Sequence, residues 1–178
     1  RRLYPVDAKV KWPNDILVNG RKAAGILTEL NAELDHIKYV ILGIGVDVNL
    51  GPADFPAELR KAATSLKAEL GKAVSRPELA VAILREQVRR LREAGFPIRE
   101  AAAAYPPGTT GRNASVFRNV LEAVGLEVKS LVDEPSAAGL ALEIASGAVV
   151  DIGGGTTGIS VIRDGKVVKP YKRVYKPE

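Results

Sequence analysis

The sequence predicts an α/β protein of the α+β kind, in which an antiparallel β-meander with two helices precedes a helix–strand–helix–hairpin segment. Three local patterns carry this prediction. Asn19-Gly20 and Asp164-Gly165 each lie between apolar runs and favour tight hairpin turns, because these residue types tolerate positive φ. Ser75 followed by Glu78 has the form of a capping box, which marks the start of a helix. Unpaired strand edges in the two segments leave one merged mixed sheet as an alternative.

Strands are expected on both sides of Asn19-Gly20, with the return strand running from Lys22 to Leu30. A further apolar strand spans residues 37–49, and its glycines indicate a bulge or a close approach by a ligand. Trp12 precedes these strands, and we expect it to pack in the core under the meander.

Helices are expected next, first over Ala57–Leu70 with Gly71 as its stop, then from the Ser75 cap to Gly95-Phe96-Pro97. Four arginines on the second helix (Arg85, Arg89, Arg90 and Arg92) are interpreted as its solvated face.

The pattern changes after residue 100, and the seam between the two segments is expected at residues 99–105, which divides the chain into 1–100 and 101–178. Ala101–Ala104 leads into a loop rich in Pro and Gly. A helix stopped by Gly125, a strand at 128–132, a helix from Pro135 to Ala145 and two strands around a Gly/Thr loop complete the second segment.

Composition excludes several classes of function. The net charge is +5, but basic and acidic residues are interspersed, so no basic stripe for nucleic acid is present. The absence of cysteine excludes disulfides and thiolate metal sites. No apolar run is long enough to span a membrane and no signal peptide is recognisable, so a cytoplasmic location is expected. The chain contains no Met, which suggests a fragment, a processed piece or an engineered chain.

Several motifs in residues 5–100 resemble those of biotin–protein ligases. They are Lys11-Trp12-Pro13-Asn14-Asp15, the run Gly20–Glu29, the run Gly43–Asn49, Ala63-Thr64-Ser65-Leu66 and Gly95–Glu100. The resemblance implies ATP-dependent formation of biotinyl-adenylate and transfer of biotin to a lysine of a biotin carrier protein, with biotin, ATP and Mg²⁺ as ligands.

The resemblance assigns Lys22 and Asp15 to catalysis, Lys22 beside the adenylate phosphate and Asp15 as a ligand of the magnesium-nucleotide. Further contacts to biotin and nucleotide are assigned to Asn14, Gly25, Gly43, Gly45 and Asn49. The alternative is that this meander is only a scaffold, with Lys22 a solvated strand lysine and Asp15 an ordinary turn residue.

Two departures from the ligase pattern favour a partial or inactive form. The family's glycine- and arginine-rich loop, which normally lies upstream of the lysine-tryptophan-proline motif, has no counterpart after Arg1. Asp47 stands where the family usually has Asn, and a carboxylate near a triphosphate adds repulsion unless a metal intervenes.

Residues 101–168 resemble the actin-like ATPases, most closely the ethanolamine-utilisation protein J family, which is chaperone-like. The resemblance lies in Tyr105–Thr109, Val116–Val120, Asp133–Ala138 and Val150–Gly158. It implies a phosphate loop in which Asp151 positions Mg²⁺ or the attacking water, and backbone amides or hydroxyls hold phosphate at Gly153, Gly154, Gly155, Thr156 and Thr157. The alternative is a tight glycine hairpin with no ligand.

Three classes of function therefore stay open: a biotin–protein ligase or its remnant, an ATP-dependent chaperone-like module, and a catalytically silent chimera. Each segment has unpaired strand edges, so a homo-oligomer formed through them is a further expectation.

Overall fold

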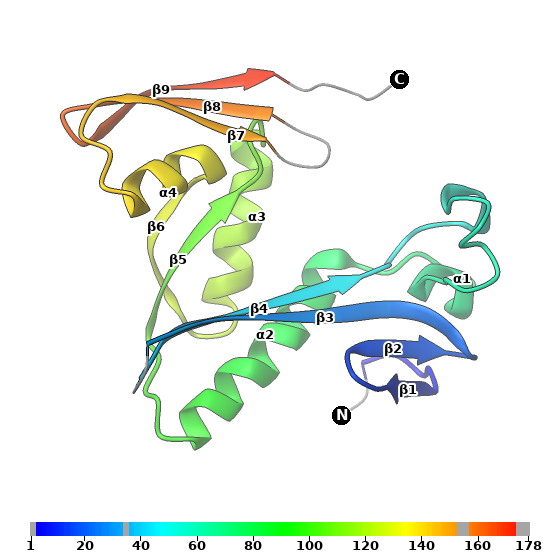
Figure 1. Cartoon of the computed structure of the whole chain (residues 1–178). Helices are drawn as coiled ribbons and strands as arrows, with labels where there is room; N and C mark the ends of the chain where they lie inside the picture. The colour runs from blue at the N-terminus through cyan, green and yellow to red at the C-terminus, as the bar shows by residue number, and fades with distance from the viewer. Residues whose placement is uncertain (1–2, 34–35, 153–156, 174–178) are drawn as a thin grey trace. The chain divides into compact units, whose positions relative to one another are not determined.

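The computed structural model describes residues 3–33, 36–152 and 157–173 and has an α+β fold (Figure 1). The chain forms two compact units, residues 1–79 and residues 80–178. The described strands form three separate sheets, so the alternative of one merged sheet is wrong for these strands. Within the described parts of the chain, no helix combines the length and the apolar character needed to cross a bilayer.

The first unit contains the predicted antiparallel meander. Its four strands pair in sequence order: β1 (Ala8–Lys11), β2 (Asp15–Val18), β3 (Arg21–Ala32) and β4 (Ile37–Val46). Asn19 and Gly20 form the β2–β3 turn with φ of 50° and 77°, as their residue types predict. The strand expected over residues 37–49 ends at Val46. Trp12 is 86% exposed, so its predicted place in the core was wrong.

The helix expected over Ala57–Leu70 is much shorter than predicted. A 3₁₀ turn spans Pro52–Asp54, and helix α1 covers only Leu66–Leu70. Ser65 caps α1 by accepting a hydrogen bond from the Ala68 amide at 3.1 Å. Upstream of this cap, the backbone at Ala62–Thr64 pairs with Lys22 of β3, which is incompatible with a helix there.

Helix α2 (Arg76–Glu93) begins at the predicted cap, where the Glu78 amide donates to Ser75 Oγ at 3.4 Å. Its apolar stripe belongs to the core of the second unit. Val88 is buried with Val124 and Leu126, and the partly buried residues Val81, Leu84, Ile98, Ala101 and Leu121 pack around them. Arg89 and Arg90 pair with acidic residues of the same helix and lie on its exposed face, as predicted.

One strand of the second unit was missed. Glu100–Tyr105, interpreted as a lead into a loop, forms β5 and pairs in parallel with β6 (Glu127–Asp133). Helix α3 (Gly111–Glu122) connects them, capped by Thr110. Its Phe117 ring lies 6.4 Å from that of Tyr105, centre to centre.

Helix α4 (Glu134–Ala141) packs on an antiparallel sheet of three strands: β7 (Gly147–Ile152), β8 (Thr157–Arg163) and β9 (Lys166–Arg173) (Figure 1). Pro135 is its second residue rather than its first, and the helix ends four residues before Ala145. A side chain at Gly139 would place its Cβ 2.3 Å from the Ile162 side chain, so glycine is what lets α4 approach β8.

A buried polar network fixes the start of α4. Asp133 Oδ1 accepts hydrogen bonds from the amide and the hydroxyl of Ser136, at 3.0 and 2.8 Å. The Ser136 and Ser160 hydroxyls lie 2.5 Å apart, so the network links α4 to β8. Each buried hydroxyl therefore has a partner, as burial requires.

Candidate functional site

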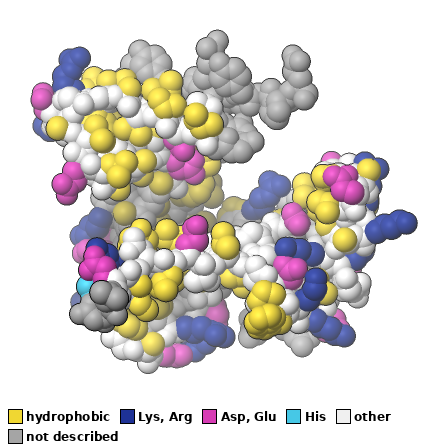
Figure 2. Space-filling view, viewed as in Figure 1, with side chains coloured by type: hydrophobic (Ala, Val, Ile, Leu, Met, Phe, Trp, Pro, Cys, Tyr) yellow, Lys and Arg dark blue, Asp and Glu magenta, His cyan; other side chains and the backbone are white. Residues whose placement is uncertain are grey.

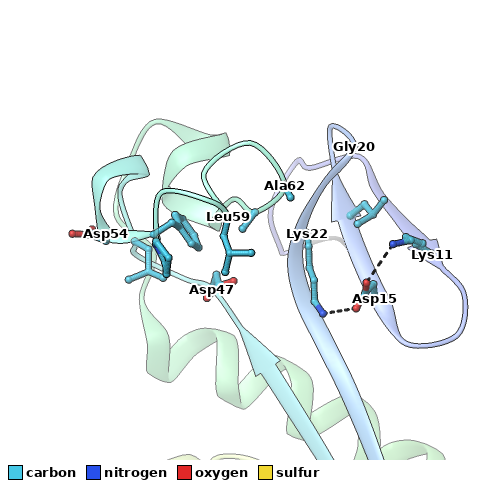
Figure 3. Close-up of a pocket in the computed structure, with 13 residues that line it drawn as sticks. Lys11, Asp15, Gly20, Lys22, Asp47, Asp54, Leu59 and Ala62 are labelled. Atoms are coloured by element: carbon cyan, nitrogen blue, oxygen red, sulfur yellow. Dashed lines mark ion pairs between the residues drawn. The ribbon is translucent and has the colours of Figure 1, made fainter. Parts of the chain in front are cut away.

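The candidate site is a pocket of 820 Å³ in the first unit (Figure 3). Its polar lining contains two lysines and three aspartates: Lys11, Lys22, Asp15, Asp47 and Asp54. Its apolar lining comes mostly from the segment between β4 and α1, namely Leu50, Phe55, Pro56, Leu59, Ala62 and Ala63. One side can therefore bind a polar group and the other a ring or an alkyl chain.

Lys22 and Asp15, the two predicted catalytic residues, are in direct contact. Lys22 Nζ lies 2.5 Å from Asp15 Oδ1, and Lys11 Nζ lies 3.8 Å from Asp15 Oδ2. The hydrogen bond from Lys22 lowers the pKa of Asp15, and the positive charges of Lys22 and Lys11 act in the same direction. Asp15 is therefore a carboxylate at neutral pH. No role had been assigned to Lys11, although it belongs to the same motif and lies four residues before Asp15, across the β1–β2 turn.

Gly25 makes room for this ion pair. A Cβ at Gly25 would lie 3.3 Å from Lys22 Cε and Nζ and 3.9 Å from Asp15 Oδ1. Strand pairing places Asp15, Gly25 and Gly45 side by side in one row across β2, β3 and β4. Gly43 is the next residue on the same face of β4, where it pairs with Leu27. The glycines predicted to contact ligand thus lie together on one sheet face, and their contact with a ligand stays a prediction.

The backbone around Lys22 is fixed on both sides. Its amide donates to the Ala62 carbonyl at 2.8 Å, and its carbonyl accepts from the Thr64 amide at 2.8 Å. Lys22 can consequently move its side chain while its main chain stays bound between β2 and the segment 62–64.

Asn14 and Asn49 have structural partners. The Asn14 carbonyl accepts from the Ile26 amide at 2.9 Å. The Asn49 side chain binds both backbone groups of Val74, donating to its carbonyl and accepting from its amide at 2.9 Å each. Nucleotide contacts by these two residues stay predictions.

A buried acid next to the pocket was not expected from the sequence. The side chain of Glu69 in α1 is 4% exposed and accepts hydrogen bonds from Asn19 at 2.6 Å, Arg21 at 2.6 Å and Thr64 at 2.5 Å. Burial alone would raise the pKa of Glu69, but these hydrogen bonds and the Arg21 charge outweigh it and lower that pKa. Glu69 therefore ties the β2–β3 turn to α1 and supports one edge of the pocket.

The described residues do not form a metal centre by themselves. No group of three or more His, Cys, Asp or Glu side chains among them could hold a metal ion. Both Asp15 oxygens face ammonium groups rather than an open coordination position. A magnesium ion would need most of its ligands from phosphate and water, so the Mg²⁺ assignment at Asp15 stays a prediction.

In the second unit, only part of the predicted phosphate loop lies in the described residues. Asp151 is near the end of β7 and Thr157 begins β8, and both are partly buried. Burial and then the charge of Asp151 raise the pKa of Glu134, so these two carboxyl groups are neighbours. Gly153, Gly154, Gly155 and Thr156 lie outside the described residues, and the phosphate and Mg²⁺ assignments there stay predictions.

Comparisons with known proteins relate the two parts of the chain to different families. Residues 2–47 match the Biotin/lipoate A/B protein ligase family. The bifunctional ligase/repressor BirA of Bacillus subtilis is 52% identical over 71 residues, which are 40% of this chain and 22% of that protein. Ethanolamine utilization protein EutJ of Escherichia coli is 45% identical over 89 residues, which are 49% of this chain and 31% of that protein.

A crystal structure of EutJ from Carboxydothermus hydrogenoformans is 46% identical in sequence, with a TM-score of 0.47 over 57% of this chain and 38% of that one. The chain thus spans less than half the length of each of these relatives. One part of the chain is thus similar to part of a biotin ligase, and another part is similar to a region of EutJ.

Proposed function

We propose that the first unit binds biotin and its adenylate, and that its activity is of the biotin–protein ligase kind, with ATP as the nucleotide and a biotin carrier protein as the acceptor. The observation that carries this proposal is the Lys11–Asp15–Lys22 cluster, which faces an apolar wall across an 820 Å³ pocket. Biotin combines an apolar bicyclic ring and alkyl chain with a carboxylate, and this chemistry matches the two sides of the pocket.

Lys22 is the residue that would contact the acyl phosphate. Its ammonium is held over Gly25 by Asp15, so it is in place before a ligand arrives. A phosphate oxygen that binds Lys22 would compete with Asp15 for the same donor. Lys11, whose side chain is 64% exposed, can then keep Asp15 paired.

We further propose that these residues favour binding over rapid turnover. Lys22 already shares its charge with Asp15, and the pocket contains more acids than bases. Little positive charge is left to stabilise the negative charge that develops as pyrophosphate leaves. The chain as it stands is therefore expected to retain adenylate better than it makes it.

Titration calorimetry with a non-hydrolysable biotinyl-adenylate analogue tests the proposal. Lys22→Ala is expected to weaken binding about tenfold, the effect of losing one charge-assisted hydrogen bond. Lys9→Ala, which removes an exposed lysine of β1 outside the pocket, is expected to leave binding unchanged. Equal affinity of the wild-type protein and Lys22→Ala would reject the proposal. Binding of ATP but not of the analogue, insensitive to Lys22→Ala, would move the function to the EutJ-like region.

The β3–β4 ribbon supports a proposal about self-association. Apolar side chains on it are exposed on both faces, and Figure 2 shows such side chains gathered along it: Leu27, Leu30, Ile37, Tyr39, Val40, Ile41 and Leu42. β4 has β3 as its sheet neighbour on one side only, among the described strands. An edge strand this apolar is a template for another strand, and we propose that two copies pair through β4.

Ile41→Lys places a charge in the middle of this edge and is expected to shift a dimer to monomer in sedimentation velocity. Lys38→Arg, on the same strand, keeps the charge and is expected to leave the dimer intact. A wild-type protein that sediments as a monomer at all concentrations would refute the pairing.

A further inference from the structure

Asp47 follows β4 and lines the same pocket as Lys22 (Figure 3). Its main chain is held on both sides, because its amide donates to the Ala23 carbonyl at 2.9 Å and its carbonyl accepts from the Leu66 amide at 2.9 Å. The residue cannot move out of the pocket without breaking the join between β3 and α1. The place of Asp47 in the lining is therefore fixed at the main chain.

The charged side chains of the pocket differ in whether they have a bonding partner. Lys22 and Lys11 both face Asp15, and Asp54 accepts a hydrogen bond from the Gly51 amide at 2.6 Å. For the Asp47 carboxylate, the described residues provide neither a hydrogen bond nor an ion pair. Figure 3 shows Asp47 beside Leu59 on one side of Lys22, with Asp15 and Lys11 on the other.

With all five side chains ionised, two lysines face three aspartates, and the carboxylate without a partner lies against the apolar wall. A partly buried charge acts over several ångströms with less screening than a charge in bulk water. An anionic group that enters the pocket therefore meets a net negative lining.

We infer that Asp47 makes this pocket select against ligands with an unneutralised anionic group. Asp47 thus sets the ligand charge that the pocket accepts. An anion that brings its own cation is favoured over the same anion alone, and biotin binds less tightly than it would without the Asp47 carboxylate. Burial, only partly opposed by Lys22, raises the pKa of Asp47, which agrees with a carboxylate short of partners. The inference rests on the proposed biotin pocket for its ligand, but its charge rule can be tested separately.

The experiment compares biotin with biotinol, its uncharged alcohol, in the wild-type protein, in Asp47→Asn and in Asp7→Asn. Asp7 is an exposed residue outside the pocket, so its substitution controls for the change in net charge. Asp47→Asn is expected to raise the affinity for biotin about tenfold and to leave the affinity for biotinol unchanged. A tenfold change corresponds to about 1.4 kcal/mol of repulsion between the Asp47 carboxylate and the carboxylate of biotin. An unchanged ratio of the two affinities would overturn the inference.

Inorganic pyrophosphate without divalent cation is the second probe, and it does not depend on biotin recognition. Tighter pyrophosphate binding to Asp47→Asn than to the wild-type protein and Asp7→Asn supports the inference. Equal or no binding to all three contradicts it. If neither biotin nor biotinol binds any variant, the proposed function fails, and the pyrophosphate result alone decides the role of Asp47.

Discussion

Replacing Gly158 by alanine is expected to destabilise the second unit by about 3 kcal/mol, at the upper end of the usual cost of overpacking. A Cβ at this position would lie 2.7 Å from Cβ and Cγ of Pro107 and 2.8 Å from Cγ of Pro135. Both neighbours are proline rings, which cannot rotate away as an isoleucine side chain can. The substitution must therefore separate β8 from the start of α4 or from the loop after β5.

Urea unfolding, followed through the amide NMR signals of β8, measures this loss. Gly111→Ala is the matched control, because a Cβ there meets nothing within 4 Å and the position is helical. Alanine at Gly111 is expected to be neutral or slightly stabilising, since it reduces the entropy of the unfolded chain. Equal midpoints for Gly158→Ala and Gly111→Ala would show that the two prolines do not confine β8.

Glu69→Gln is expected to cost the first unit about 2 kcal/mol at neutral pH. Glutamine keeps the shape of the side chain but loses the charge that three donors share, and its own amide N–H groups point at Asn19 or Arg21. Glu58→Gln, an exposed substitution in the same unit, is the control and is expected to have little effect.

The same residue predicts a dependence on pH. The pKa of Glu69 is lowered in the folded state from its ordinary value of 4.5, so its contribution is complete above that value and is lost as pH falls through the lower folded pKa. Urea midpoints measured from pH 7 downwards should converge for wild-type protein and Glu69→Gln in acid. Parallel profiles at all pH values would mean that Glu69 is not ionised in the folded protein.

How far the sequence could predict the fold depended on whether the signal was local. Asn19-Gly20 and Asp164-Gly165 adopt the positive φ angles, and Ser75 caps α2, as their residue types predicted. β5 was missed because its run of alanines has no strand preference, and pairing with β6 decides its conformation. The prediction of a helix from Ala57 was also wrong because of a distant contact: Ala63 pairs with Lys22.

The candidate site shows the same limit. Lys22 and Asp15 could be predicted because they belong to a local motif, and the structure brings them together. Glu69 could not, because its partners at Asn19 and Arg21 lie about 50 residues away and no local pattern links them. Trp12 was misplaced because its residue type favours burial, whereas the turn that follows the edge strand β1 leaves its side chain in solvent.

The position of the seam between the two parts of the chain stays a prediction. The EutJ match covers 49% of the chain, so it cannot lie wholly within residues 101–178, which make up about 44% of it. The match to the biotin ligase of Paracoccus denitrificans covers 52% of the chain, so it cannot lie wholly within the first compact unit, residues 1–79. The two matches therefore place the seam neither at residues 99–105 nor at the start of α2.

The paired hydrogen bonds between Asn49 and Val74 have a consequence for how the pocket can change during evolution. They join the two ends of the excursion that carries the apolar wall, as a strand pair would. Ala62–Thr64 and Leu66 are bound to Lys22 and Asp47, so a change of length is tolerated only before them, in residues 51–61. There a longer or shorter wall alters mainly the entropy of loop closure, which grows only by about 0.6 kcal/mol for each doubling of length. The wall can thus accept insertions and new side chains while β4 and the lysine side of the pocket stay in place.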